Sequence, residues 1–451
     1  MLMASSSNAQ WSSRWAFIMA AVGSAVGLGN IWGFPYEAGQ GGGGAFVLIY
    51  LFFVFVIGMP LLIAELSLGR RGRMSPIGSM KKIAEEEGKS TLWQLIGWSG
   101  VIGAFIVISF YSVVGGWVLA YVVKALSGFS GLAADSSAEV FTSFIADPYL
   151  PIISHAAFMG ITIFIVAKGV EGGLEKAVTF LMPALFVLLV GLVIYSAFTG
   201  AFAQTLSFLF APDFSKLTLN VALNALGQSF FSLSLALGSI MTYGAYLKRD
   251  VNIGKSAAII ASADTGVAVL AGLAIFPIVF AYGLNPGAGG GLVFISLPIA
   301  FGQMPGGVVI GTLFFSLLAV AAITSAISLL EPSVSYVSEK TGKDRRKVAA
   351  TIGFAAFILG IFSSLGQSGN ILGDVSIFGY SIMDAKDSLT KNWMMPLGGM
   401  FTALFVGWFV SRKSMMEELA MNDSSFKIWY FLVRFVCPVA IAAVFISIVF
   451  L

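Results

Sequence analysis

Residues 21–35, AVGSAVGLGNIWGFP, are apolar enough to lie in a membrane but contain too many glycines for one continuous helix. Each glycine inside a helix costs about 1 kcal/mol relative to alanine. In lipid, a broken helix is tolerated only where its freed N–H and C=O groups meet other protein, a cavity or a ligand. Glycines also let membrane helices pack closely. Because four of them lie here with Asn30 and a proline, we expect an unwound binding segment.

The composition is that of a membrane protein. Hydrophobic residues make up 58% of the chain and charged residues 10%, with a mean hydropathy of +0.92. The net charge of +3 is too small to suggest nucleic-acid binding, and the single cysteine, Cys437, cannot form an internal disulfide. We find no nucleophile–base or metal constellation in the sequence, so an enzyme is not predicted.

Apolar runs of about 20 residues, the length that crosses a bilayer, predict an all-α polytopic membrane protein built as one domain, residues 1–451. We expect eleven spans, near 15–38, 44–68, 93–125, 150–167, 177–199, 220–246, 256–283, 306–337, 347–365, 390–410 and 427–450.

Lysine and arginine between the spans set the expected orientation. If the N-terminus is cytoplasmic, only Lys216, Lys386 and Lys391 of these residues fall outside. An odd number of spans then places Leu451 outside the cell. We therefore expect a multi-pass protein of the cell membrane, in a bacterium the inner membrane.

A second interruption lies in the sixth span, at residues 228–238, QSFFSLSLALG. The first and sixth spans hold corresponding positions in two halves of five helices. That pattern is expected when inverted repeats place discontinuous helices around substrate and ions at the bilayer midplane. We expect repeat one at about 15–199, repeat two at about 220–410 and an extra helix at about 427–450.

The motifs GSAVGLGNIWGFP, GGGGAF, GQSFFSLSLALGSIMTYGAY and AITSAISLLEP, in this order, resemble the neurotransmitter:sodium symporter family across essentially the whole chain. Within it, the chain resembles the eleven-helix bacterial amino-acid branch. The resemblance implies a leucine-transporter-like fold, with two inverted five-helix repeats plus an eleventh helix.

The resemblance also implies two sodium sites, and a small hard cation needs about five or six oxygen ligands, which broken helices can supply. Sodium 1 would be bound by Ala25, Asn30, Ser232 and Asp264, together with the substrate carboxylate. Sodium 2 would be bound by Gly23, Val26, Ala321, Thr324 and Ser325.

Asp264 lies in an apolar run, where an unpaired carboxylate costs several kcal/mol, so it should face a cation, a partner or a proton. The alternative is a structural aspartate that is protonated or hydrogen-bonded. If this chain is matched to the family's pattern one residue earlier, Ala263 takes the place of Asp264 in the sodium 1 site. Chloride-dependent relatives need an anion near the sodium, and a fixed carboxylate supplies that charge. We therefore expect chloride-independent transport.

For the substrate, freed N–H groups at Leu28 and Gly29 form an anion site at a helix end, to which the resemblance adds the Tyr111 hydroxyl. The family's amine carriers have an acid where this chain has Gly27, so an α-amino acid is favoured. The remaining pocket positions are apolar or small, which favours hydrophobic side chains, aromatic ones included. The expected substrate residues are Ala25, Leu28, Gly29, Val107, Tyr111, Phe231, Ser232, Ser234, Leu237, Ser325 and Leu329.

Two further features concern the gates. The family usually has an arginine before the Phe-Pro of the first span, paired with an acid; this chain has Gly33, and Asp387 or Asp384 resembles the acid. In the fifth span, Pro183 removes a helical hydrogen bond. Either it is a static kink, or this half-helix unwinds to let water reach sodium 2.

These observations predict a sodium-coupled symporter of hydrophobic L-amino acids that works by alternating access, with two Na⁺ ions and the lipid bilayer as its partners. A substrate-gated channel or an amino-acid sensor on the same fold is the alternative.

Overall fold

The computed structural model of the chain describes residues 10–129, 131, 134–198, 200–287 and 291–450. These residues form helices joined by short connections, and the only β-structure among them is an isolated bridge between Ile377 and Tyr380. Leu451, which the sequence places outside the cell, lies outside the described residues.

The first half of the chain forms ten α-helices. They are α1 (Arg14–Ala25), α2 (Phe34–Gln40), α3 (Gly44–Phe53), α4 (Met59–Gly72), α5 (Pro76–Glu86), α6 (Gln94–Ser127), α7 (Ala134–Ala146), α8 (Leu150–Ala167), α9 (Lys176–Ala197) and α10 (Phe202–Phe210).

The second half continues in the same way. Its helices are α11 (Leu219–Ser232), α12 (Ser239–Ala245), α13 (Ile253–Ala281), α14 (Leu297–Gln303), α15 (Gly307–Thr341), α16 (Arg345–Leu365), α17 (Ile382–Ser388), α18 (Met395–Leu404), α19 (Arg412–Leu419), α20 (Asp423–Phe431) and α21 (Cys437–Phe450). π-Helical turns join several neighbours, among them η1 (Gly29–Gly33), η4 (Val170–Glu175) and η7 (Leu389–Met394).

Eight helices in the described residues are long and apolar enough to cross a membrane, or up to ten if each of two bent pairs is one span. One bent pair is the first predicted span, Arg14–Ala25 with Gly29–Gln40, which meet at 49°. The sixth predicted span is α11 and α12, interrupted at 233–238, and each half is too short to cross alone. Each of the eleven predicted segments thus coincides with a helix or an interrupted helix.

The tenth span differs from its prediction. It begins at Ile382, not near residue 390, so Lys386 lies in the helix where the sequence suggested a loop. Lys386 is tolerated there because its Nζ donates hydrogen bonds to the Leu359 carbonyl (2.7 Å) and the Ser363 hydroxyl (2.8 Å) of α16. The predicted loops also contain short helices, α5, α7, α10, α14 and α19, which their length hides from a search for spans.

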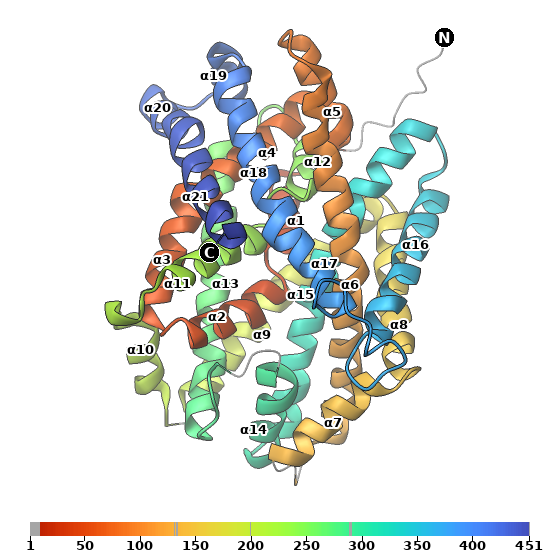
Figure 1. Ribbon diagram of the computed structural model, residues 1–451, viewed down its shortest axis with the longest axis vertical. Coiled ribbons are helices and arrows are strands. Elements are labelled where there is room, and N and C mark those ends of the chain that lie inside the picture. Colours follow the sequence, from red (N-terminus) through yellow and green to blue (C-terminus); the bar gives the residue numbers. More distant parts are fainter. Residues whose placement is uncertain (1–9, 130, 132–133, 199, 288–290, 451) are drawn as a thin grey trace.

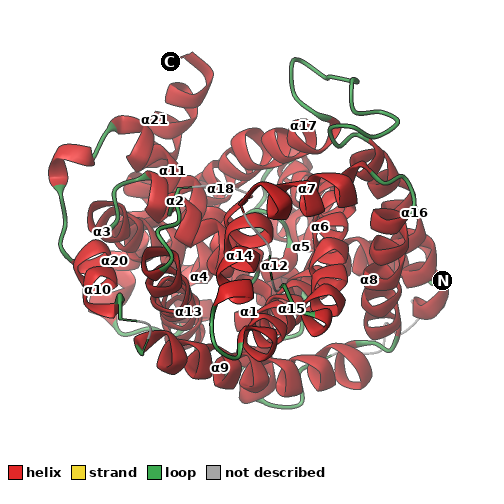
Figure 2. Cartoon of the chain, turned by 90° about the horizontal axis from the view of Figure 1, so that it is seen from below, coloured by secondary structure: helices red, strands yellow, loops and turns green. Residues whose placement is uncertain are grey.

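The interrupted helices lie in the middle of the bundle. Figure 1 shows α5 and α19 at one end of the molecule, and α7, α10 and α14 at the other. Seen along the bundle in Figure 2, α1, α12 and α15 occupy the centre, with α8 and α16 at one edge and α3, α10 and α20 at the opposite edge. The long helices α6 and α15 pack along each other and frame the breaks.

Ion pairs connect the helix ends near α5 and α19. Arg70 pairs with Glu418 at 2.6 Å, and Arg71 pairs with Glu87 at 2.7 Å. Burial alone would raise the pKa of Glu87, but hydrogen bonds from Arg71 and from the Ser411 N–H hold it below its ordinary value. Several cationic side chains that the sequence assigns to the cytoplasm are therefore fixed at this one end.

Candidate substrate and sodium sites

The first break places backbone polar groups in the middle of the bundle. α1 ends at Ala25, and Gly27 donates its N–H to Oδ1 of Asn30 at 3.1 Å. A Cβ on Gly27 would overlap Oγ of Ser325 and lie 3.1 Å from Oη of Tyr111. Only glycine therefore lets the chain run between these two hydroxyls.

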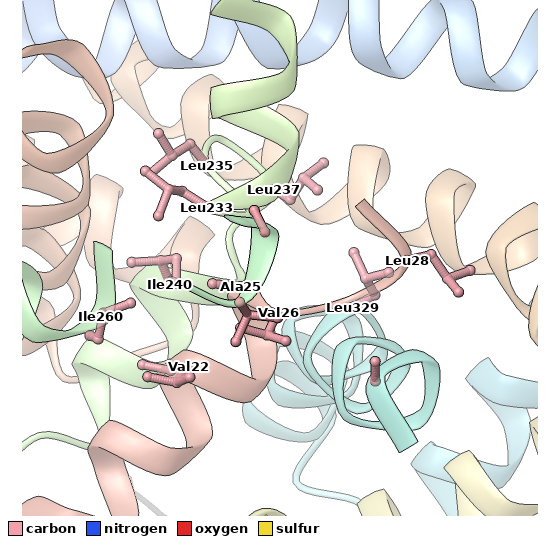
Figure 3. Packing of buried hydrophobic residues seen from close by; sticks show 14 of the residues in the cluster. Val22, Ala25, Val26, Leu28, Leu233, Leu235, Leu237, Ile240, Ile260 and Leu329 are labelled. Atoms are coloured by element: carbon pink, nitrogen blue, oxygen red, sulfur yellow. The ribbon is translucent and has the colours of Figure 1, made fainter. Parts of the chain in front are cut away.

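The second break is strained. Ser234 and Ala236 adopt the left-handed conformation, with φ of 52° and 62°, which costs of order 1–3 kcal/mol for a non-glycine residue. Two contacts hold them: Ala236 donates its N–H to Oε1 of Glu65 at 2.7 Å, and Ser234 donates its hydroxyl to the Ser24 carbonyl at 2.8 Å. The second contact joins the two breaks, which lie beside each other in Figure 3.

Three of the four residues predicted for sodium 1, Asn30, Ser232 and Asp264, are brought together around the buried side chain of Asp264. The fourth, Ala25, lines the cavity between the two breaks. Asn30 donates its Nδ2 to Oδ1 of Asp264 (2.6 Å) and to Oγ of Ser232 (3.0 Å). Ser232 in turn donates to Oδ2 of Asp264 at 2.7 Å. Tyr50, from α3, donates its hydroxyl to Ser232 at 3.1 Å. Three broken or neighbouring spans thus direct hydrogen-bond donors at one carboxylate.

The residues predicted for sodium 2 also converge. Oγ of Ser325 lies 3.3 Å from the Gly23 carbonyl and 3.2 Å from the Val26 carbonyl. Thr324 donates its hydroxyl to the Ala321 carbonyl at 3.0 Å. Carbonyls at the end of α1 therefore face the Ser325 hydroxyl of α15, and the Thr324 hydroxyl is bonded within α15 at the next position. Neutral oxygens of this kind suit a small cation.

Helix α9 covers this second cluster. A Cβ on Gly23 would lie 3.1 Å from Sδ of Met182 and 3.3 Å from Cβ of Thr324. Met182 is fully buried and precedes Pro183, the proline inside α9. The helix with the interior proline is therefore in direct contact with the end of α1.

A narrow cavity lies between the two breaks. Ten of the eleven predicted substrate residues line it. The exception is Ser232, while Ser24 and Gly27 are additions. The full lining is Ser24, Ala25, Gly27, Leu28, Gly29, Val107, Tyr111, Phe231, Ser234, Leu237, Ser325 and Leu329.

The polar end of this cavity lies at the first break, where the Leu28 N–H donates to Oη of Tyr111 at 3.3 Å. A second cavity lies beyond Tyr111 and Phe231, which line both spaces. We call this second cavity, with a volume of about 250 Å³, the vestibule. Its lining is Leu28, Gly29, Trp32, Gly33, Tyr36, Glu37, Phe110, Tyr111, Val114, Gln228, Phe231, Met383, Asp384, Asp387 and Lys391.

Sequence reasoning missed three polar residues near the breaks. Tyr50 is one of many aromatic residues in apolar runs and gave no signal of its own. Glu65 could have been found by the argument used for Asp264, because it is an acid inside an apolar span. Gln228 donates its Nε2 to the Gly29 carbonyl at 2.6 Å, a contact between two spans that no sequence pattern reveals.

A polytopic helical protein with two interrupted central helices and oxygens gathered at both breaks has the architecture of a membrane transporter. The family model described as "Sodium:neurotransmitter symporter family" matches residues 8–137 and 150–451. The chain belongs to this family of sodium-coupled transporters and is a sodium-dependent transporter; such families are not enzymatic in general.

Similar proteins cover nearly the whole chain. "Uncharacterized sodium-dependent transporter YhdH" of Bacillus subtilis is 40% identical, over 98% of this chain and 97% of its own. An "Uncharacterized sodium-dependent transporter" of Haemophilus influenzae is 36% identical, over 97% of each chain. A crystal structure of MhsT in complex with L-phenylalanine matches with a TM-score of 0.90 and 44% identity, covering 97% of this chain and 99% of that one. The predicted fold, that of leucine-transporter-like proteins, is confirmed by this likeness.

Proposed function

We propose that this protein is a sodium-coupled symporter of hydrophobic L-amino acids, aliphatic and aromatic, that works by alternating access. Two facts support the substrate class: the similar MhsT structure contains L-phenylalanine, and the side-chain end of the cavity is apolar. The observation that carries the proposal is the position of this cavity, which lies between two helix breaks and next to both oxygen clusters.

The substrate carboxylate would bind at the end of the first break. The N–H groups of Leu28 and Gly29 lie at a helix end, which attracts an anion. The Tyr111 hydroxyl accepts a hydrogen bond from the Leu28 N–H there. The amino group would be received by the Ala25 and Phe231 carbonyls together with the carbonyl of Ser232 and the hydroxyl of Ser234. Because position 27 is a glycine and not an acid, the substrate itself must supply the carboxylate.

Side-chain selection would occur among Val107, Phe231, Leu237, Ser325 and Leu329, which line the cavity. None of the residues that line this cavity carries a charged side chain, so burying a charged substrate side chain there would cost several kcal/mol. The Leu237 side chain is smaller than an aromatic ring, so this position leaves room for larger substrates.

Coupling follows from shared ligands. Sodium 1 would be bound by Ala25, Asn30, Ser232 and Asp264 and completed by the substrate carboxylate, so each ligand stabilises the site of the other, and this linkage is reciprocal. Sodium 2 would be bound by Gly23, Val26, Ala321, Thr324 and Ser325, which would hold α1 against α15.

The proposal extends to topology. The two inverted repeats are assigned to about 15–199 and 220–410, with an extra helix at about 427–450. The Lys- and Arg-rich end with α5 and α19 is assigned to the cytoplasm, so the N-terminus is inside and the C-terminus is outside, in a bacterial inner membrane.

A binding screen of the twenty amino acids, with purified protein in sodium or in potassium buffer, tests the proposal. We expect sodium-dependent binding of leucine, phenylalanine, tyrosine and tryptophan, and none of aspartate or lysine. The Leu237→Phe variant should lose affinity for tryptophan more than for leucine. Binding that is equal in both buffers, or strongest for a charged amino acid, would contradict the proposal.

A further inference from the structure

The outer end of the first span lacks the cation that the family resemblance implies. Gly33 occupies that position, and a Cβ there would lie 3.3 Å from both Nε2 and Oε1 of Gln228. Gln228 is itself held by its hydrogen bond to the Gly29 carbonyl. The space next to Gly33 is therefore occupied by a neutral amide that bridges the first and sixth spans.

A cation enters the same vestibule from a different helix. Lys391, in the π-helical turn η7, lines the vestibule together with Glu37 of α2 and Asp387 of α17. Its side chain runs along α11, with Cε 3.9 Å from the Cβ position of Gly227. Lys391 interacts electrostatically with both Glu37 and Asp387.

Glu37 is the better-placed acid for a gate. It is buried, with 8% of its surface exposed, and Asn224 donates a hydrogen bond to its Oε2 at 3.0 Å. A buried carboxylate in a membrane span needs a counter-charge. In the described part of the chain, no ion pair of 4.0 Å or less involves Lys391, so Lys391 and Glu37 line the same vestibule without forming an ion pair.

Lys386, the residue before Asp387, holds α17 in place. Lys386 is hydrogen-bonded to α16, as described above, and so anchors α17 to the outer part of the bundle. A change in the η7 turn would therefore move Lys391 relative to α2 while α17 stays in place.

We propose that the outer gate of this protein has reversed polarity: Lys391 of the tenth span supplies the cation and closes onto Glu37 of the first span, with Asp387 as the second acid. This inference rests on the proposed function, since the gate retains a substrate in the cavity behind Tyr111 and Phe231. Lys391 acts on the substrate only through the closure of the vestibule, so it is a positioning residue.

Dissociation of tritiated L-phenylalanine from purified protein in sodium buffer tests this gate. Lys391→Gln and Glu37→Gln should each speed dissociation about tenfold, and the double variant should be no faster than either single one, because the two residues act as a pair. The charge exchange Glu37→Lys/Lys391→Glu should slow dissociation again, as should Gly33→Arg added to Lys391→Gln. Lys216→Gln, an exposed lysine outside both cavities, is the control and should change nothing.

A second readout needs no substrate. Val114→Cys, placed on the vestibule wall in a Cys437→Ser background, is labelled by a charged methanethiosulfonate reagent. Lys391→Gln should raise the labelling rate several-fold, and the charge exchange should reverse the increase. Unchanged labelling and dissociation in Lys391→Gln, or additive effects of the two single variants, would overturn the gate. Failure of the wild-type protein to bind any amino acid would instead overturn the proposed function, while the labelling experiment would still decide the gate.

Discussion

Ser232 donates a hydrogen bond of 2.7 Å to Oδ2 of Asp264, which connects the end of α11 to the middle of α13. Both side chains are buried, and Asn30 of the first break donates to both of them. A ligand that changes the position of any of these three groups therefore changes the surroundings of the other two. This contact is the structural basis of the coupling proposed between sodium 1 and the substrate.

Replacing Ser232 with alanine keeps its carbonyl but removes one of the oxygens proposed for sodium 1. Loss of a buried polar partner costs about 1–3 kcal/mol, so apparent sodium affinity should fall about tenfold, measured by binding at graded sodium concentrations. Apparent affinity for the substrate should fall too, and raising sodium should restore most of it.

The control for this variant is Ser229→Ala. The Ser229 hydroxyl is also buried but donates to the Leu226 carbonyl of its own helix at 2.7 Å. A substrate defect of the same factor at every sodium concentration would point to a local pocket effect and against shared ligands.

The Asp264 carboxylate should make transport independent of chloride, because its negative charge lies where an anion would otherwise balance the sodium. Uptake should be unchanged when gluconate replaces chloride. In Asp264→Asn, the fixed charge is lost, and we expect uptake that requires chloride or is abolished. Collapse of wild-type uptake on removal of chloride is the contrary result.

Gly27→Ala should weaken substrate binding at least tenfold, since its Cβ would overlap the Ser325 hydroxyl at the polar end of the cavity. Overpacking of this kind costs about 1–3 kcal/mol. Gly266→Ala is the matched control, because a Cβ there has no atom within 4 Å and should leave equilibrium binding unchanged. Equal substrate affinities of the two variants would show that Gly27 does not contribute to the binding site.

Pro183→Ala should slow transport several-fold while equilibrium binding changes little. The interior proline leaves the Thr179 carbonyl without a helical donor, so this part of α9, which covers the Gly23–Thr324 contact through Met182, opens more readily. Pro332→Ala in α15 tests a second interior proline and should not slow transport selectively while leaving binding intact. Equal losses of binding and transport in Pro183→Ala would identify a static kink.

Much of the fold follows from local properties of the sequence. Each span is an apolar run of bilayer length, and glycines in the first span and serines with glycine in the sixth indicated the two breaks. Both signals are local, because helix propensity and membrane thickness act within one segment. The positions of Asn30, Ser232 and Asp264 in one cluster were inferred from family resemblance, since no local pattern brings residues so distant in sequence together.

Other features depend on contacts between spans. Lys386 was assigned to a loop because a lysine in lipid is costly, whereas the Leu359 carbonyl and Ser363 hydroxyl that satisfy it belong to another helix. Tyr50 and Lys391 were likewise recognised only from the residues that they face. Short helices such as α5 were missed because hydropathy windows detect length and apolarity, not amphipathic turns.

Uptake of tritiated L-phenylalanine into sealed proteoliposomes, under an imposed inward sodium gradient, tests the central claim most directly. A symporter accumulates the amino acid above its external concentration, and accumulation ends when the gradient is dissipated or when potassium replaces sodium. Equilibration to the external concentration without accumulation would identify a channel. Sodium-dependent binding without any uptake would identify a sensor, and either result would contradict the account.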